Sequence, residues 1–321
     1  MVALPTRSTA AHQQSFVANL RGLFARPRPS VTEQFVIGIG AQRAGTTTLH
    51  QILERCTPVF MHPYKELHYF DTVHGIRDAA ASRTFATSLL GKGCHAPPFG
   101  EQRYAADDPR AWTFIRTCTL LSRAAVHEID YRDLFLPGGT GRGLFGEITP
   151  EYMLLDKKGV EGMRRVVGSD ARLILMVRNP VQRLISGFKL LMHNRVDGRQ
   201  PANPGALLIH HLETQSRFIQ RQDAFNDYVR SVQLFDALFP GRLLVLRYDS
   251  LFDDREGLRL RLEQFLGEPV DAEEFSRVTD VRYNSLGESA SMPPEVLQRL
   301  EARYRDQIAF INERCGRECV R

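Results

Sequence analysis

The sequence predicts an α/β protein: a three-layer sandwich with a central, mostly parallel sheet and a P-loop-like phosphate-binding turn. Three observations lead to this prediction. Short apolar runs recur along the chain, helix-like patterns separate them, and the first run passes through a glycine-rich turn into a helix. Buried parallel strands are typically near-continuous apolar runs, and strands that alternate with helices indicate a parallel sheet. The predicted strands are Phe35–Gly40, Leu144–Ile148, Arg172–Val177, Leu243–Tyr248 and, more weakly, Val59–Met61.

The segments between these strands carry the spacing of amphipathic helices. The predicted helices are Thr47–Cys56, Gly159–Val167, Val181–His193, Asp223–Phe239, Glu256–Leu266 and a last one at Pro294–Arg314. Clusters of glycine and proline predict loop-rich insertions at Gly91–Pro109, Leu136–Gly143 and His193–Gly205.

Residues 1–32 contain no Asp or Glu and are predicted to form a basic, flexible N-terminal arm. An organelle transit peptide and a contact with anionic lipid are the two alternatives. We expect residues 33–321 to form one domain, with substrate-loop insertions near 73–143 and 193–211. No apolar run is long enough to cross a bilayer, so no transmembrane segment is expected.

The composition is that of a globular protein, with 43% hydrophobic and 25% charged residues. The formal charge of +5 suits an anionic ligand, but a solvated basic surface would have the same charge. No nucleic-acid partner is predicted. The five cysteines lack the spacing of a zinc site, which favours free thiols in a reducing compartment and hence a cytoplasmic location. We expect no metal.

The first predicted strand leads into GAQRAGTTTL, the local architecture of a phosphate-binding loop. Gly40 and Gly45 allow a tight turn, and the amides of the next helix favour negative charge. Thr46 stands where a nucleotide triphosphatase needs lysine, so the loop suits a single terminal phosphate flanked by Arg43. The alternative is an ordinary strand-to-helix turn with incidental glycines.

A second phosphate-binding pattern lies at RLILMVRNPVQRLISGF. Arg178 follows a predicted strand, at the end where open α/β sheets bind ligands. Asn179 and Pro180 are good helix-starting residues. Ser186 falls on the same side of that helix as Arg183, and arginine with a hydroxyl suits a second phosphate group. Alternatively, Arg178 caps a neighbouring helix and Ser186 only packs.

Two further segments carry ionisable groups. In KELHYFD, Glu66 and His68 alternate, so an extended segment would project both from one face, and either could act as a general base. In GEITPEY, Glu147 and Tyr152 come to another sheet edge. Taken singly, an anchored surface segment and a plain turn would explain the two patterns.

The order of these four motifs resembles that of the PAPS-dependent sulfotransferases, most closely the heparan sulfate and related carbohydrate sulfotransferases and their bacterial relatives. The resemblance covers about residues 35 to 265. It implies a donor, 3′-phosphoadenosine 5′-phosphosulfate (PAPS, product PAP), with two separated phosphates. It also implies Glu66 as the catalytic base and Arg43 beside the leaving phosphate, while the residues themselves leave His68 open as the alternative base.

The resemblance further implies which residues bind the donor. The 5′-phosphosulfate would be held by Arg43, Ala44, Gly45, Thr46, Thr47 and Thr48, and the 3′-phosphate by Arg178 and Ser186. From their position in the sequence, Arg282 and Tyr283 are expected to close over the nucleotide. Glu66, Glu147 and Tyr152 are expected beside the substrate.

Two positions depart from the family pattern. The fourth motif commonly reads E-K-T-P, but Ile148 occupies the lysine position, so a charged group is lost or comes from another residue. Position 43 is Arg where many relatives carry Lys, and a guanidinium fork differs from a point charge.

The sequence therefore predicts direct, in-line sulfuryl transfer from PAPS to a hydroxyl or amine. The acceptor would be a glycan, a lipid-linked molecule or a small molecule. Two other functions compete with this prediction: a P-loop-type nucleotide phosphotransferase, and a non-catalytic nucleotide-binding relative.

Overall fold

A computed structural model describes residues 33–91, 108–139, 141, 143–194, 203–281, 283 and 292–316. Its centre is a five-stranded sheet with strand order β2-β3-β1-β4-β5, in which every pairing is parallel. The α/β prediction is therefore confirmed. The strands are β1 (Gln34–Gly40), β2 (Phe60–Met61), β3 (Leu144–Ile148), β4 (Arg172–Val177) and β5 (Leu243–Arg247).

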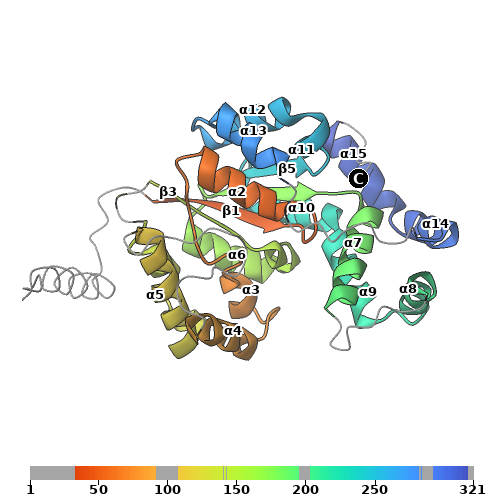
Figure 1. The fold of residues 1–321 in the computed structure, drawn as a ribbon, viewed down its shortest axis with the longest axis horizontal. Coiled ribbons are helices and arrows are strands. Elements are labelled where there is room, and N and C mark those ends of the chain that lie inside the picture. The colour runs from red at the N-terminus through yellow and green to blue at the C-terminus, as the bar shows by residue number, and fades with distance from the viewer. Residues whose placement is uncertain are drawn as a thin grey trace, which may run out of the picture.

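Helices cover both faces of the sheet (Figure 1). One face carries α2 (Thr46–Cys56), α11 (Ser250–Asp253), α12 (Arg255–Leu266) and α13 (Ala272–Asp280). The other face carries α3 (Tyr69–Val73), α6 (Lys157–Val167) and α10 (Tyr228–Leu238). Consecutive parallel strands joined by right-handed crossovers place helices in this way. Among the helices of the described ranges, none is long and apolar enough to span a membrane.

The prediction was wrong about two long helices. Asp223–Phe239 is divided between α9 (Arg217–Asn226) and α10, because the Asp227 side chain accepts a hydrogen bond from Arg230 N and starts a new helix. The last segment is likewise divided, at Tyr304, into α14 (Pro294–Arg303) and α15 (Arg305–Cys315).

The predicted insertions are largely helical where the structure describes them. The first contains α4 (Ala79–Gly91), α5 (Pro109–Arg123) and two 3₁₀ turns, η1 (Val126–Glu128) and η2 (Tyr131–Phe135). The second contains α8 (Pro204–Glu213). Residues 92–107 and 195–202, which held most of the predicted loops, lie outside the described residues, as does the predicted arm at 1–32.

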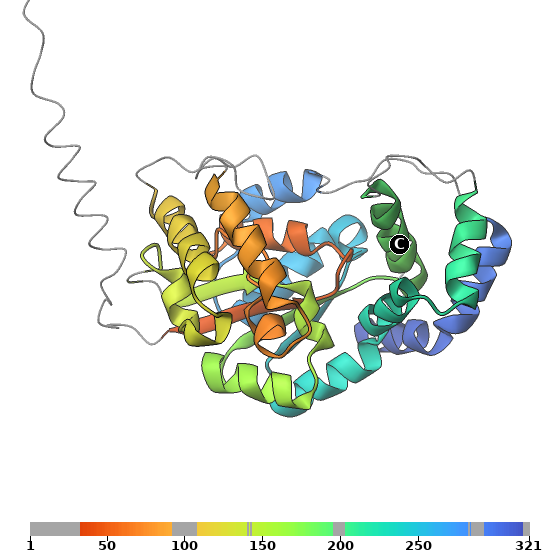
Figure 2. The same ribbon diagram turned by 90° about the horizontal axis from the view of Figure 1, so that it is seen from below.

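Within the described residues, the buried apolar side chains gather in two clusters. The larger fills both faces of the sheet. The smaller joins α8, α9 and α14 to α7 (Pro180–His193), and its fully buried members include Leu184, Leu208 and Leu300. Figure 2 shows these four helices together at one end of the molecule. Helix α7 therefore begins at the sheet and ends in the smaller cluster.

Backbone hydrogen bonds bring three chain segments together at the carboxyl ends of the strands, which we call the carboxyl edge of the sheet. Central β1 pairs with both β3 and β4. Beyond the strand ends, Ala41 N donates to Met176 O at 2.8 Å, and Thr149 N donates to Gly38 O at 3.0 Å. The segments that follow β1, β3 and β4 are thereby held at neighbouring strand spacings of about 4.8 Å.

Gly38 on β1 has no side chain, and the side chain of Ile148 on β3 fills the space beside it. A Cβ built on Gly38 would lie 2.6 Å from Ile148 Cγ1, and Ile148 is only 1% exposed. We expect Gly38→Ala to lower the free energy of unfolding by about 1–3 kcal/mol through overpacking, as measured by urea denaturation.

Gly91→Ala is the matched control, because nothing lies within 4 Å of the position of its Cβ. It should change the free energy of unfolding by less than about 0.5 kcal/mol. In an Ile148→Ala background, Gly38→Ala should cost less than in the wild type. Equal costs in the two backgrounds would show that Gly38 and Ile148 do not share this space.

Candidate functional site

The loop between β1 and α2 ends in an uncapped helix N-terminus. Gly45 is the N-cap residue, in a left-handed conformation with φ of 87°, and it has no side chain with which to cap the first turn. A Cβ at this position would lie 2.8 Å from the Tyr248 ring, so the position needs glycine for both reasons. The amides of the first turn, Thr46 to Thr48, are therefore arranged as an anion site would require.

Two guanidinium groups lie side by side at this loop. Arg43 Nε donates to Ser186 Oγ at 2.9 Å, and an Arg178 Nη atom donates to Arg43 O at 3.0 Å. The Arg178 guanidinium lies over the Tyr248 ring, 4.6 Å from its centroid, while its buried Nε has no hydrogen-bond partner. Burial, and then the charge of Arg178, lower the pKa of Arg43. An anion between the two groups would relieve the repulsion and satisfy the unpaired donor.

Arg183 does not form the expected pair with Ser186. It is fully buried, and it donates to the Asn226 side chain and to the backbone and side-chain oxygens of Gln222. A further Nη atom lies 3.4 Å from Gln42 O, in the loop after β1. Arg183 therefore ties this loop to α9, and Arg43 takes its place beside Ser186.

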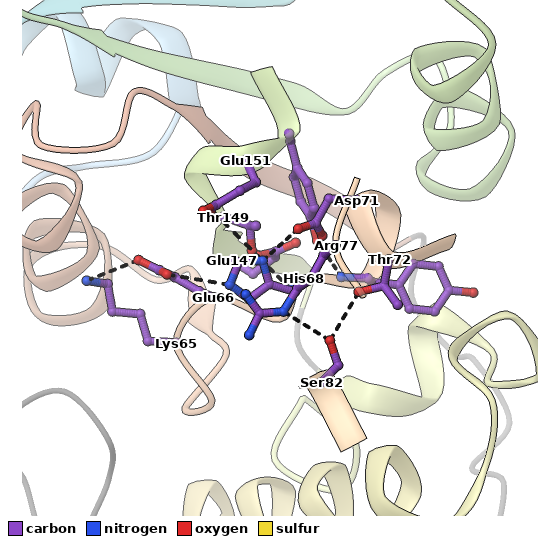
Figure 3. Close-up of polar contacts among 12 residues, drawn as sticks. Lys65, Glu66, His68, Asp71, Thr72, Arg77, Ser82, Glu147, Thr149 and Glu151 are labelled. Atoms are coloured by element: carbon purple, nitrogen blue, oxygen red, sulfur yellow. Dashed lines mark hydrogen bonds and ion pairs between the residues drawn. The ribbon is translucent and has the colours of Figure 1, made fainter. Parts of the chain in front are cut away.

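Glu66 and His68 meet at a turn rather than on an extended segment. Both residues are left-handed, with φ of 61° and 52°. Their side chains nevertheless converge, with His68 Nε2 3.6 Å from Glu66 Oε2 (Figure 3). The two side chains therefore lie close together, as predicted, but a turn rather than the alternation of an extended strand brings them together. Left-handed conformations of non-glycine residues cost energy and cluster at functional sites.

His68 lies within a group of carboxylates. Its Nδ1 is 2.7 Å from Asp71 Oδ2 and 4.0 Å from Glu151 Oε2 (Figure 3). An Nη atom of Arg221 donates to the other Glu151 oxygen at 3.0 Å. Burial alone would lower the pKa of His68, but the Asp71 and Glu66 carboxylates raise it to about 9. The imidazole is therefore protonated at neutral pH, with its Nδ1 hydrogen-bonded to Asp71 and its Nε2 at ion-pair distance from Glu66.

Glu66 is ionised in this setting. Burial alone would raise its pKa, but the hydrogen bond to His68 and the charge of Lys65 outweigh burial, so the pKa falls below its usual value. Its side chain is 26% exposed, whereas that of His68 is 9% exposed. Of the two candidate bases, Glu66 is the one that is unprotonated at neutral pH and reachable from solvent.

Glu147 and Tyr152 lie beneath the site. Both are almost completely buried: Glu147 accepts hydrogen bonds from Tyr131 and Thr149, and Tyr152 Oη accepts one from Tyr69 N at 3.1 Å. Burial raises the pKa of Glu147 to about 7. Neither side chain reaches the surface in this conformation, so the geometry supports a positioning role, and the predicted contact with substrate stays a prediction.

Lys65 is a site residue that the sequence reasoning missed. Its Nζ donates to Thr47 Oγ1 at 2.6 Å, which joins KELHYFD to the first turn of α2. The sequence does show a lysine directly before Glu66. Its partner Thr47 lies in another motif, so the sequence pattern did not reveal the contact. Arg282 lies outside the described residues, and Tyr283 packs, half-buried, against the larger apolar cluster.

Glu66, His68 and Glu151 have ligand-type atoms within 4.8 Å of one another, a spacing that could suit a metal ion. The protonated imidazole, Arg221 and Lys65 already balance these carboxylates, and a protonated imidazole has no lone pair for a metal. The expectation of no metal stays a prediction.

Comparisons with known proteins bear on the family and the fold of the chain. A family model described as the sulfotransferase family matches residues 35–272, more than two thirds of the chain. No curated protein sequence matches. The fold is similar to a sulfotransferase from Alicyclobacillus acidocaldarius, with a TM-score of 0.52 and 20% identity over 91% of this chain and 98% of that one.

Sulfotransferase STF9 from Mycobacterium avium is also similar, with a TM-score of 0.47 and 17% identity over 91% of this chain and 80% of that one. The family match is to sulfotransferases in general, so the expected specific likeness to heparan sulfate enzymes finds no support in it.

The raised pKa of His68 makes stability depend on pH. The folded protein binds the His68 proton more tightly than the unfolded chain, whose pKa is about 6.5. The contribution is therefore complete below pH 6.5 and is lost as pH rises towards about 9. At roughly 1.4 kcal/mol per pKa unit, it is on the order of 3 kcal/mol. We expect His68→Gln to cost more at pH 6 than at pH 9.5, as measured by urea denaturation.

His74→Gln serves as a control of opposite sign, because burial lowers the pKa of His74. Its effect on stability should become more unfavourable as pH rises. If His68→Gln costs the same at both pH values, His68 is not held protonated by its carboxylates.

Proposed function

We propose that this chain, which belongs to the sulfotransferase family, transfers a sulfuryl group from PAPS to an acceptor hydroxyl or amine. The observation that carries the proposal is the pair Arg43 and Arg178 beside the uncapped N-terminus of α2. The hydrogen bond from Arg178 to Arg43 O joins the second motif to the loop that leads into α2, and together the two features suit a ligand with two separated phosphate groups.

The residues present fit such a donor. The first turn of α2, with Thr46, Thr47 and Thr48, would hold the 5′-phosphosulfate through its amides. Arg178, with its unpaired buried Nε, and Ser186 would hold the 3′-phosphate. Arg43 already bridges the two halves through its hydrogen bond to Ser186.

Glu66 is assigned as the base that takes the acceptor proton. It is ionised and partly exposed, and the protonated His68 holds its carboxylate from one side. His68 is in turn fixed by Asp71, so the carboxylate is oriented before the acceptor arrives.

The donor, when bound, supplies an activated sulfuryl group on its 5′-phosphate. The chain's contribution is positive potential where charge develops on the departing phosphate, from Arg43 and the N-terminus of α2. Because this is positioning and electrostatics, no metal is required, and we expect activity to persist in EDTA.

The acceptor is assigned only to a class: a hydroxyl or amine of a carbohydrate or small molecule.

Binding of PAP should distinguish this function from nucleotide phosphotransfer. At a concentration of a hundred times its dissociation constant, PAP should add about 2.7 kcal/mol to the free energy of unfolding, visible as a rise in melting temperature. AMP, ADP and ATP lack the 3′-phosphate and should give smaller shifts. In Arg178→Gln, the shift with PAP should fall towards that with AMP.

A larger shift with ATP than with PAP would favour the phosphotransferase. PAP binding without transfer to a broad panel of acceptors would favour a non-catalytic nucleotide-binding protein.

Removal of the base should abolish turnover without loss of the donor site. We expect Glu66→Gln, which keeps the shape of the side chain, to lower kcat by ~10²–10⁴-fold with PAPS as donor. Its melting temperature with PAP should match that of the wild type. If His68→Gln shows this pattern and Glu66→Gln does not, His68 is the base.

A further inference from the structure

Lys65 lies where two parts of the site meet, although no motif assigned it a role. It lies just before Glu66, and Figure 3 shows its side chain directed towards that carboxylate. The Nζ atom is 4.0 Å from Glu66 Oε1 and 2.6 Å from Thr47 Oγ1, a hydroxyl in the first turn of α2. The ammonium therefore lies between the proposed base and the proposed phosphosulfate loop.

The burial of this ammonium is costly. The Lys65 side chain is only 7% exposed. Burial and the charge of Arg43 lower the pKa of Lys65, and they outweigh the Glu66 carboxylate, which alone would raise it. A buried cation beside other cations is unfavourable unless an anion offsets it. Arg43, Lys65 and the α2 N-terminus all place positive potential on the same small volume, so that volume is suited to an anion.

The position that carries lysine in the E-K-T-P form of the fourth motif cannot supply this charge. Ile148 occupies it and packs against Gly38 in the core. The sequence left open whether a charged group had been lost or had moved, and the geometry offers a group at a different place in the chain.

We propose that Lys65 is a catalytic residue that stabilises the departing 5′-phosphate, an inference that rests on the proposed sulfuryl transfer. In this step the bond between the acceptor oxygen or nitrogen and sulfur forms while the bond between sulfur and the bridging phosphate oxygen breaks. The electron pair stays on the bridging oxygen, and the acceptor proton passes to Glu66. Lys65 keeps its proton and donates a hydrogen bond to the oxygen that gains charge.

This role predicts that Lys65 acts more strongly on the product than on the donor. The 5′-phosphate of PAP carries more charge than the 5′-phosphate of PAPS, one of whose oxygens is bonded to the sulfuryl group, so the ammonium should contribute more to PAP binding. Adenosine 3′-phosphate lacks the 5′-phosphate altogether and should not depend on Lys65. A lysine that only supports the fold would affect all three ligands alike.

The test is Lys65→Met, which keeps the length of the side chain and removes its charge. We expect PAP affinity to fall by about 10–100-fold, as for the loss of a charged hydrogen bond, with the affinity for adenosine 3′-phosphate unchanged. In steady-state assays with PAPS, kcat should fall by ~10²–10³-fold, with a smaller change in the KM for PAPS. Lys157→Met, at an exposed position on α6, is the matched control and should change none of these quantities.

Lys65→Arg supplies a second readout. Because arginine stays protonated to higher pH, any loss of kcat on the alkaline side should move upwards in this variant, and part of the activity lost in Lys65→Met should return. If Lys65 only supported the fold, Lys65→Arg would change neither the pH of the alkaline loss nor the activity that returns.

Two results would overturn the inference while leaving sulfuryl transfer intact. The first is a Lys65→Met enzyme with wild-type kcat and PAP affinity. The second is one that loses PAP and adenosine 3′-phosphate binding equally. If the wild type itself prefers ATP to PAP, the proposed function fails, and this role for Lys65 fails with it.

Discussion

The candidate site depends on the pairing of central β1 with both β3 and β4. Strand pairing is set by backbone hydrogen bonds, so it fixes where each following segment begins. Three segments start at the carboxyl ends of these strands: the loop that contains Gly45, the segment at Thr149, and Arg178. Side chains from distant parts of the sequence are thereby placed within reach of one another by the backbone.

Charge is divided across the carboxyl edge of the sheet in an ordered way. Arg43, Arg178 and the start of α2 make one side positive, while Glu66, Asp71 and Glu151 make the other side negative. His68 and Arg221 moderate the negative side, and Lys65 lies on the boundary. A separation of this kind suits a reaction in which a proton moves in one direction and negative charge develops in the other.

The sequence was most informative where structure is local. Strands β3 and β4 were predicted with their observed bounds, because short apolar runs between turn signals are the signature of buried strands. The division between α9 and α10 was not foreseen, because Asp227 acts there together with the distant Gln307, which accepts a hydrogen bond from Tyr228 N at the start of α10. The Lys65–Thr47 contact was missed for a related reason, since residues far apart in the sequence reveal no pairing by pattern alone. Helix α4 buries only Ser82, Ala86 and Leu89 along its length, a pattern too weak to predict it.

The position of α7 between the two apolar clusters has a mechanical consequence. This helix carries Ser186, yet most of its apolar side chains belong to the smaller cluster with α8, α9 and α14, while Arg43 and Arg178 follow the sheet strands β1 and β4. A nucleotide held by all three residues would act as a cross-link between the two apolar clusters. Resistance of the smaller cluster to proteolysis would then report on occupancy of the site, even though none of its core residues touches the ligand.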